Sequence, residues 1–272
     1  MNKKWWYFAK RNFKEIIRDP LSLIFNFIFP LAMFLLFQCF TTGKTHEEIM
    51  MQMPMFEVHR IAVAVTIFGF SFVTLFGGML VSKDCSSSFI NRLKISPLKS
   101  IDFIIGYALP MIAICFFQNI LIYLIAWPFG FNLLNDWTLL SIIINLIISL
   151  FFVLIGLIIG SLVSDKAVGG MTSILINLAA LLGCMFMPFF AMGKVYQTIC
   201  LIFPFIHFIT ISNAFIENFN QNGNYILHYP ASSEEYYQSD VFPLYLSVVI
   251  ILIYLLIVFI LTMTVFKKKI KS

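Results

Sequence analysis

Six long apolar blocks limit what this chain can fold into. Each is free of Asp, Glu, Lys and Arg and reaches the roughly 20 residues that an α-helix needs to cross the hydrocarbon core of a bilayer. Because 60% of the 272 residues are hydrophobic and 11% are charged, against about 25% in an average soluble domain, a soluble fold is excluded. We therefore predict a single all-α integral membrane domain over residues 1–272. Its six spans are expected at residues 21–40, 61–82, 103–127, 138–164, 167–192 and 243–266.

The basic residues indicate which side of the membrane each loop faces. Of the 18 Lys and Arg residues, all but Lys44, Arg60 and Lys194 lie before the first block, after the second, after the fourth or after the last. Lys and Arg are retained on the cytoplasmic side, so these segments are expected inside the cell. Most of the 13 acidic residues fall in the other loops. The pattern predicts both chain ends in the cytoplasm.

Residues 1–20 have the pattern of an amphipathic helix at the membrane surface. Aromatic residues such as Trp5, Trp6 and Phe13 are interleaved there with basic ones such as Lys10 and Arg11. This pattern is typical of a helix that lies in the headgroup plane. The alternative is a solvated basic arm, which fits two adjacent Trp residues poorly.

The longest predicted cytoplasmic loop, residues 83–102, has the character of a docking helix. Phe89, Ile90, Leu93 and Ile95 give it an apolar face, and Pro97 limits its length. A soluble partner binds such a helix in a groove. The alternative is a solvated loop tied to the membrane.

The largest predicted external segment is residues 193–242. It contains a shorter apolar stretch, 199–215, which is broken by Pro204 and His207. We interpret this stretch as re-entrant or interfacial rather than spanning. The polar remainder fits a small external cap, and equally a set of interfacial residues and turn formers.

Motifs for catalysis, metal or nucleotide binding are absent from the sequence. The five cysteines are scattered without a C-x-x-C pair, so neither a disulfide framework nor a metal site is indicated, and we interpret them as apolar fillers. Residues 42–45 (Thr-Gly-Lys-Thr) mimic the end of a phosphate-binding loop, but Gln38 stands where the motif needs Gly. His207 is the only His near membrane depth and lies outside the six spans, which disfavours an intramembrane protease. We expect no enzyme activity on this chain.

Three stretches resemble the membrane (permease) subunits of export-type, or type-2, bacterial ABC transporters. Residues 10–22, followed by Phe29 and Pro30, look like the amphipathic N-terminal helix and first span of that family. Residues 92–98 look like the end of its cytoplasmic coupling loop. Residues 156–164, 188–190 and 203–204 match its fourth and fifth spans and its re-entrant helices. The resemblance covers nearly the whole chain.

The resemblance implies partners and a location. It implies a permease in the bacterial cytoplasmic (inner) membrane that works with a second permease, as a homodimer or heterodimer, and with separate ATPase subunits. Those subunits would bind ATP and Mg, this chain would hold no cofactor, and lipid rather than nucleic acid would surround it. The coupling loop departs from the family where Asp84 and Ser86 replace a pair of glutamates. The residues expected to contact the ATPase are Asp84, Phe89, Arg92, Leu93, Ser96 and Pro97.

The spans themselves constrain the mechanism. A proton-driven carrier normally places a carboxylate or His within its spans, and these spans have none, although sodium coupling through hydroxyls and carbonyls stays open. A membrane assembly or immunity protein that moves no substrate is a further alternative. With 32 Phe residues and no charged cavity residue, an amphipathic drug, peptide or lipid-like cargo is favoured. Candidate groups for the pathway or the interface between protomers, or equally for hydrogen bonds between helices, are Asn26, Gln38, Ser71, Thr74, Gln118, Asn119, Asn145 and Asn177.

Overall fold

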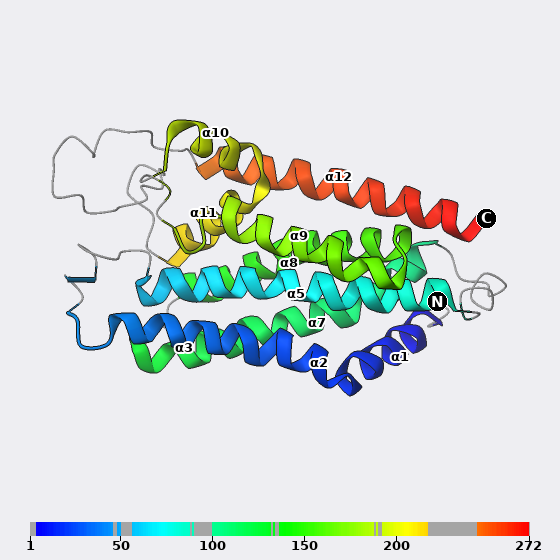
Figure 1. Cartoon of the computed structure of the whole chain (residues 1–272), viewed down its shortest axis with the longest axis horizontal. Coiled ribbons are helices and arrows are strands. Elements are labelled where there is room, and N and C mark those ends of the chain that lie inside the picture. The colour runs from blue at the N-terminus through cyan, green and yellow to red at the C-terminus, as the bar shows by residue number, and fades with distance from the viewer. Residues whose placement is uncertain are drawn as a thin grey trace.

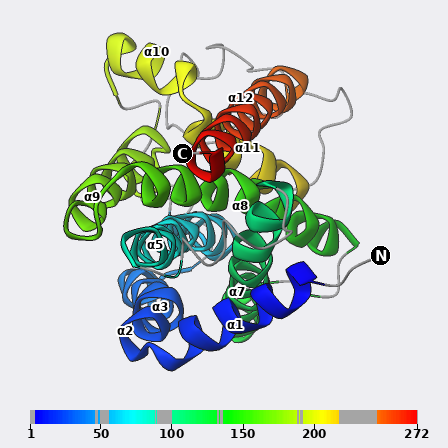
Figure 2. The same ribbon diagram turned by 90° about the vertical axis from the view of Figure 1, so that its right-hand side faces the viewer.

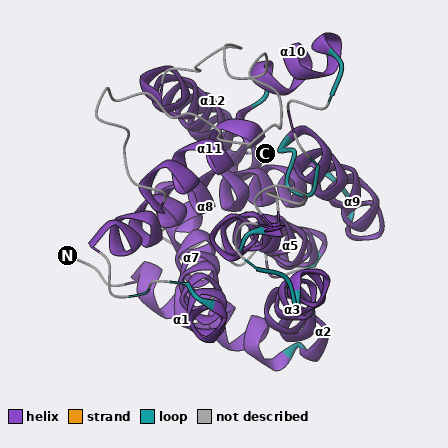
Figure 3. Ribbon diagram, turned by 90° about the vertical axis from the view of Figure 1, so that its left-hand side faces the viewer, coloured by secondary structure: helices purple, strands orange, loops and turns teal. Residues whose placement is uncertain are grey.

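In the computed structural model, residues 4–45, 48–49, 56–87, 89, 100–131, 133, 136–187, 189, 192–216 and 244–271 are described. Over these ranges the elements are helices and connecting loops (Figure 3). Six of the helices are long and apolar enough to cross a membrane. The chain is thus an all-α integral membrane protein, which confirms the predicted fold class. Both termini lie at the same end of the bundle (Figure 1), as an even number of spans requires.

The first span is a helix with a wider turn near its start. The side chain of Asp19 caps it by accepting from the backbone N–H of Leu21, and Pro20 occupies the first helical position. Further along, Pro30 has no N–H for the carbonyl of Asn26. The chain accommodates this loss in a π-helical turn, in which the N–H of Phe29 donates to the carbonyl five residues earlier. The parts of the span are α2 (Pro20–Leu23), η1 (Ile24–Ile28) and α3 (Phe29–Thr41).

The other spans agree with the predicted blocks except at one end. The predicted fifth span, 167–192, was too long, because its helix ends at Leu182. There Gly183 caps the helix and Cys184 takes a φ of 48°, a left-handed conformation that reverses the chain. The remaining spans are α5 (Val58–Ser86), α7 (Ser100–Ala126, continued by the 3-10 turn η3, Trp127–Phe129), α8 (Asp136–Leu162), α9 (Asp165–Leu182) and α12 (Leu244–Lys271).

The predicted re-entrant stretch is a pair of short helices. They are α10 (Lys194–Ile202) and α11 (Pro204–Ile216), which meet at an angle of 84°. Pro204 starts the second helix and His207 lies in its first turns, so the two residues that interrupt the apolar pattern mark the bend. The side chain of His207 contacts the hydroxyl of Ser247 at 3.0 Å, which links α11 to α12.

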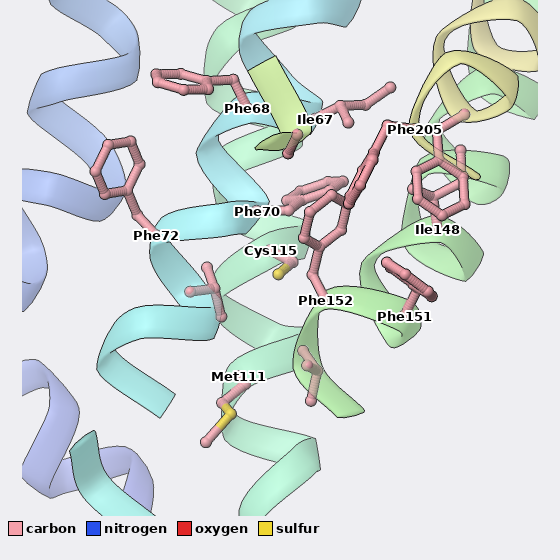
Figure 4. Close-up of a cluster of buried hydrophobic side chains, with 14 of the residues drawn as sticks. Ile67, Phe68, Phe70, Phe72, Met111, Cys115, Ile148, Phe151, Phe152 and Phe205 are labelled. Carbon is pink, nitrogen blue, oxygen red and sulfur yellow. The ribbon is translucent and has the colours of Figure 1, made fainter. Parts of the chain in front are cut away.

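Helix α5 is the centre of the bundle. Viewed along the bundle, it lies among α3, α7, α8 and α9 (Figure 2). Of its most apolar window, 89% is buried, against 17% for α12. Aromatic side chains fill the space between α5, α8 and α11, where Phe70, Phe152 and Phe205 meet (Figure 4). A helix that is apolar on all sides is expected at such a position.

Small residues let α5 and α8 approach closely. A Cβ atom added at Gly160 would come within 2.3 Å of the carbonyl oxygen of Gly78, and one at Gly156 within 2.8 Å of that of Thr74. The hydroxyl of Thr74 also donates to the carbonyl of Phe152 at 2.9 Å. Close packing of small residues and hydrogen bonds between helices are what hold helices together in lipid.

This contact predicts the effect of adding one methyl group. Gly160→Ala must push α8 away from α5, because the obstacle is backbone, so we expect a loss of about 1–3 kcal/mol in the free energy of unfolding. Gly170→Ala on α9 is the matched control, since a Cβ atom there meets nothing within 4 Å. SDS-induced unfolding of the purified chain measures both. Equal stability of the two variants would contradict the close contact.

Candidate functional site

The N-terminal helix α1 (Lys4–Arg18) packs against the bundle at the end that carries both termini (Figure 2). Its buried residues, Phe8, Ala9, Asn12 and Ile16, recur at helical spacing and so share one face. Its neighbour Tyr7 is 73% exposed. The predicted amphipathic helix is therefore present, and its buried face is bound to α7 and α5.

A carboxylate on α5 binds side chains from both neighbouring helices. The guanidinium of Arg11 donates to both oxygens of Asp84, with 2.8 Å between Nη2 and Oδ1. The hydroxyl of Tyr107 on α7 donates to Oδ2 of the same carboxylate at 2.9 Å. A paired arrangement of this kind fixes direction as well as distance. Asp84 thus joins α1, α5 and α7 at one point.

A proline in α7 provides the second attachment of α1. Pro110 lacks the N–H that would bond the carbonyl of Gly106 within the helix. The side-chain amide of Asn12 donates to that carbonyl at 3.0 Å instead. The ring of Phe8 lies against the same glycine, where a Cβ atom would come within 2.2 Å of it. Gly106 and Pro110 together form the place on α7 where α1 binds.

A residue of the predicted coupling loop, Phe89, also contacts α1. Phe89 stacks on Phe8 with 6.3 Å between ring centroids, and the guanidinium carbon of Arg11 lies 4.2 Å from the centroid of Phe89. A cation over an aromatic face at this distance is attractive. We call Phe8, Arg11, Asp84, Phe89 and Tyr107 the α1 junction.

Charges around the α1 junction favour its ion pair. Glu15 forms ion pairs with Arg11 at 2.8 Å and with Lys83 at 3.4 Å. Burial alone would lower the pKa of the Arg11 guanidinium, but the hydrogen bond and charge of Asp84, with the charge of Glu15, raise its pKa above the ordinary value. Arg11 therefore stays protonated in the junction.

The structure places two of the six residues expected to contact an ATPase. Asp84 was expected in the loop, but it lies in the last turn of α5 and is buried against Arg11 and Tyr107. Phe89 is half-buried on α1. Contact of either with an ATPase stays a prediction. Arg92, Leu93, Ser96 and Pro97 lie outside the described residues.

Of the eight polar residues expected at the pathway or the interface between protomers, only Asn177 is exposed. It lies on α9, where its amide donates to the carbonyl of Ser173 at 2.9 Å. Thr74 makes the contact with α8 described above. The hydroxyl of Ser71 donates to the carbonyl of Phe68 within α5. These two residues bond within the chain, and a place at the pathway or the interface between protomers stays a prediction for both.

Asn119 and Asn145 belong to a buried polar cluster that joins three helices. The amide of Asn145 on α8 donates to the hydroxyl of Tyr123 on α7 at 2.8 Å, and its carbonyl oxygen accepts from Ser212 on α11. Asn119 donates to a backbone carbonyl of α8 at 3.2 Å, and the hydroxyls of Tyr123 and Ser141 are hydrogen-bonded at 3.0 Å. Tyr123 and Ser212 were not predicted for this cluster, because aromatic and hydroxyl residues are common in membrane helices for many reasons. We call Asn119, Tyr123, Ser141, Asn145 and Ser212 the polar cluster.

Three other candidates have buried polar atoms that lack a hydrogen bond in the described part of the chain. They are Oδ1 of Asn26, Nε2 of Gln38 and both terminal atoms of Gln118. The amide of Gln118 lies against the open side of Gly69, where a Cβ atom would be 1.5 Å from its nitrogen. Asn26 is bonded through its amide to the hydroxyl of Ser22 at 3.0 Å. The positions of these side chains between α3, α5 and α7 were not evident from the sequence.

These features define a multi-pass helical membrane protein whose amphipathic N-terminal helix is bound to the base of the predicted coupling loop. The chain belongs to the ABC-2 type transporter family, whose model matches residues 3–220. No curated protein matches the sequence significantly. The chain is therefore a membrane component of an ABC transporter, and family membership implies partnership with ABC ATPase subunits.

The α1 junction predicts a measurable coupling between two residues. Arg11→Gln leaves the buried carboxylate of Asp84 without its counter-charge, and Asp84→Asn leaves Arg11 with Glu15 alone, whereas the double variant removes both charges of the pair. We expect an interaction free energy of about 0.5–3 kcal/mol in a double-mutant cycle of SDS-induced unfolding. Hydrogen exchange should quicken in α1 in each single variant.

Lys83→Gln is the matched control for this cycle. Lys83 binds Glu15 at the same place, but its side chain is 69% exposed, so we expect a loss below about 1 kcal/mol. Additive effects of Arg11→Gln and Asp84→Asn would show that the ion pair does not hold α1.

Proposed function

We propose that this chain is the permease subunit of an ATP-driven exporter. Two permease subunits, identical or different, form the translocation pathway, and two separate ATPase subunits bind ATP and Mg on the cytoplasmic side. The observation that carries the proposal is the α1 junction. It ties the start of the loop that resembles a coupling loop to three helices, so that a force applied to the loop reaches the bundle.

The packing supports a rigid transmission of that force. The loop connects α5 to α7. Where the loop leaves α5, Asp84 binds Arg11 of α1 and Tyr107 of α7. From α5 the connection continues to α8 through Gly78 and Gly160. Packed helices have few intermediate arrangements, so closure of the ATPase pair would move α1, α5, α7 and α8 largely together.

The outer helices supply surface for lipid and for a second permease. The most apolar windows of the first span, α9 and α12 are 22%, 28% and 17% buried within the chain. Large apolar side chains such as Ile174 and Leu178 are exposed on α9 beside Asn177. In this proposal one such face contacts the partner permease, and the others contact lipid of the bacterial cytoplasmic membrane.

The cargo is proposed to be amphipathic. Among the described residues, the buried polar groups near the bundle centre are neutral amides and hydroxyls, while the buried charges Asp84 and Arg60 lie near the ends of α5. A drug, peptide or lipid-like molecule with a large apolar surface suits such a pathway better than a highly charged one.

Coupling to the ATPase is tested at the loop. Replacing Phe89 and Leu93 by Ser removes two apolar side chains, each worth about 1.5–3 kcal/mol if fully buried at the contact. We expect the double variant to bind the ATPase at least about a hundredfold more weakly, since each 1.4 kcal/mol is about tenfold. Co-purification with the partner ABC ATPase measures the effect.

The controls separate loss of docking from loss of folding. Leu93→Ser alone leaves the contacts of Phe89 with Phe8 and Arg11 unchanged, so it reports on the loop without disturbing the α1 junction. Val195→Ser removes an apolar side chain that is 78% exposed on α10, at the other end of the bundle, and should keep full binding. Full ATPase binding and full export by the double variant would refute this coupling mechanism.

The predicted topology is tested by labelling. Single cysteines at positions 3, 47, 234 and 269, in a chain freed of native cysteines, should react with an impermeant maleimide in intact cells only at 47 and 234. The reason is the distribution of Lys and Arg, which places positions 3 and 269 in the cytoplasm. Labelling at 269 in unbroken cells would rule out the six-span topology.

A further inference from the structure

The end of α9 and the helix α10 bring two cysteines together. The Sγ atoms of Cys184 and Cys200 lie 3.8 Å apart, although 16 positions separate the residues in the sequence. Both residues are thiols in the structure. Two sulfur atoms in a disulfide are about 2.05 Å apart, so a further approach of roughly 2 Å would allow the bond to form.

The backbone at Cys184 is a second, independent indication. Its φ of 48° is the one positive value outside glycine among the described residues. It occupies the position after the helix cap, where the N–H of Met185 closes the turn by donating to the carbonyl of Ala180 at 3.3 Å. Glycine is the usual residue there because it has no Cβ atom to clash. A cysteine at this φ is strained where a glycine would not be. We therefore expect the thiol of Cys184 to have a function that keeps cysteine at this position.

Other contacts hold α10 against α9 and fix the distance between the thiols. The hydroxyl of Tyr196 on α10 donates to the carbonyl of Leu181 on α9 at 2.6 Å. The amide of Gln197 donates to the carbonyl of Met192 at 2.9 Å, which folds the connection back on the helix. The two sulfur atoms are therefore held in contact without depending on their own attraction.

The pair lies where disulfides persist. The helix α10 is at the end of the bundle away from both chain termini (Figure 1). The distribution of Lys and Arg predicts that the termini are cytoplasmic and that this end is external. Thiols outside the cytoplasm are exposed to oxidising conditions.

We propose that Cys184 and Cys200 form a reversible disulfide by exchange with disulfide compounds on the external side of the membrane. The reaction starts at Cys184, because its side chain is half-buried whereas Cys200 is fully buried. The thiolate of Cys184 attacks one sulfur of an external disulfide and releases one thiol. Cys200 then loses its proton, attacks the sulfur of Cys184 and releases the second thiol. The protein loses two electrons and two protons, and the external disulfide gains them.

The bond would join α9 covalently to the bent pair α10 and α11. The second helix of that pair is already held to α8 through Ser212 and Asn145 and to α12 through His207 and Ser247. In the oxidised chain the ends of α9, α8 and α12 are thus linked through α10 and α11. In the reduced chain α9 is held to α10 without this covalent bond, in part by the hydrogen bond of Tyr196 with Leu181.

The experiment counts thiols in the full chain in intact spheroplasts. The cells are reduced with dithiothreitol, washed and incubated with oxidised glutathione, which does not cross the membrane. Denatured protein is then alkylated with a maleimide polyethylene glycol, which shifts its mobility once per thiol. We expect all five thiols to react before oxidation and two fewer after it. Mass spectrometry should find the peptides of Cys184 and Cys200 linked, and oxidation should raise the unfolding temperature by roughly 5–10 °C.

Variants identify the pair. Cys184→Ser and Cys200→Ser should each abolish the peptide cross-link, whereas Cys39→Ser, which removes an exposed cysteine of the first span, should keep it. Five reactive thiols after oxidised glutathione, or a cross-link that survives Cys200→Ser, would overturn the proposal. Oxidation seen only in inverted vesicles would also overturn it, because the pair would then face the cytoplasm.

Discussion

The structure depends on one constraint, which is that a backbone polar group inside a bilayer has no water to bond with. Helices satisfy the constraint by themselves except where a proline removes an N–H. At Pro30 the chain responds by widening one turn, and at Pro110 it responds by accepting a side chain from another helix. The bond made at Pro110 fixes the position of α1 on α7, because the side chain that makes it belongs to α1. Asn12 is buried because it replaces the bond that Pro110 cannot make.

The same constraint explains why polar contacts between helices are specific. Thr74, Asn145 and Ser212 each bond to a neighbouring helix, and lipid offers no competing partner. Such bonds are modest in energy, but they select one arrangement among many that apolar packing would tolerate. The polar cluster in this way fixes how the bent pair α10 and α11 meets α7 and α8.

The α1 junction and the cysteine pair lie at opposite ends of the bundle, and α5, α8 and α9 connect them. An ATPase that moves the coupling loop and a disulfide that links α9 to α10 would both affect the movement of these packed helices. If both proposals hold, oxidation of the cysteine pair would change how α5, α8 and α9 move when the coupling loop moves. Family membership supports the first of these roles, and the contact of Cys184 with Cys200 supports the second.

The sequence by itself determined the membrane fold, because the length of an apolar block reflects the thickness of the bilayer and does not depend on the neighbours of the helix. It also predicted the amphipathic helix and the interruption at Pro204 and His207, which are local patterns. It overestimated the fifth span, since the stretch after Leu182 is as apolar as the helix before it and only the turn at Cys184 marks the end.

Only the tertiary structure decided which polar residues meet. Asp84 was predicted to contact an ATPase, and the structure adds that it binds Arg11, 73 positions earlier, and Tyr107. Cys184 and Cys200 were interpreted as fillers, yet their sulfur atoms are in contact. Such pairs are set by the rotation and crossing of packed helices. The rotation and crossing of two helices depend on the side chains of both helices at once, so the sequence pattern of each helix alone does not predict them.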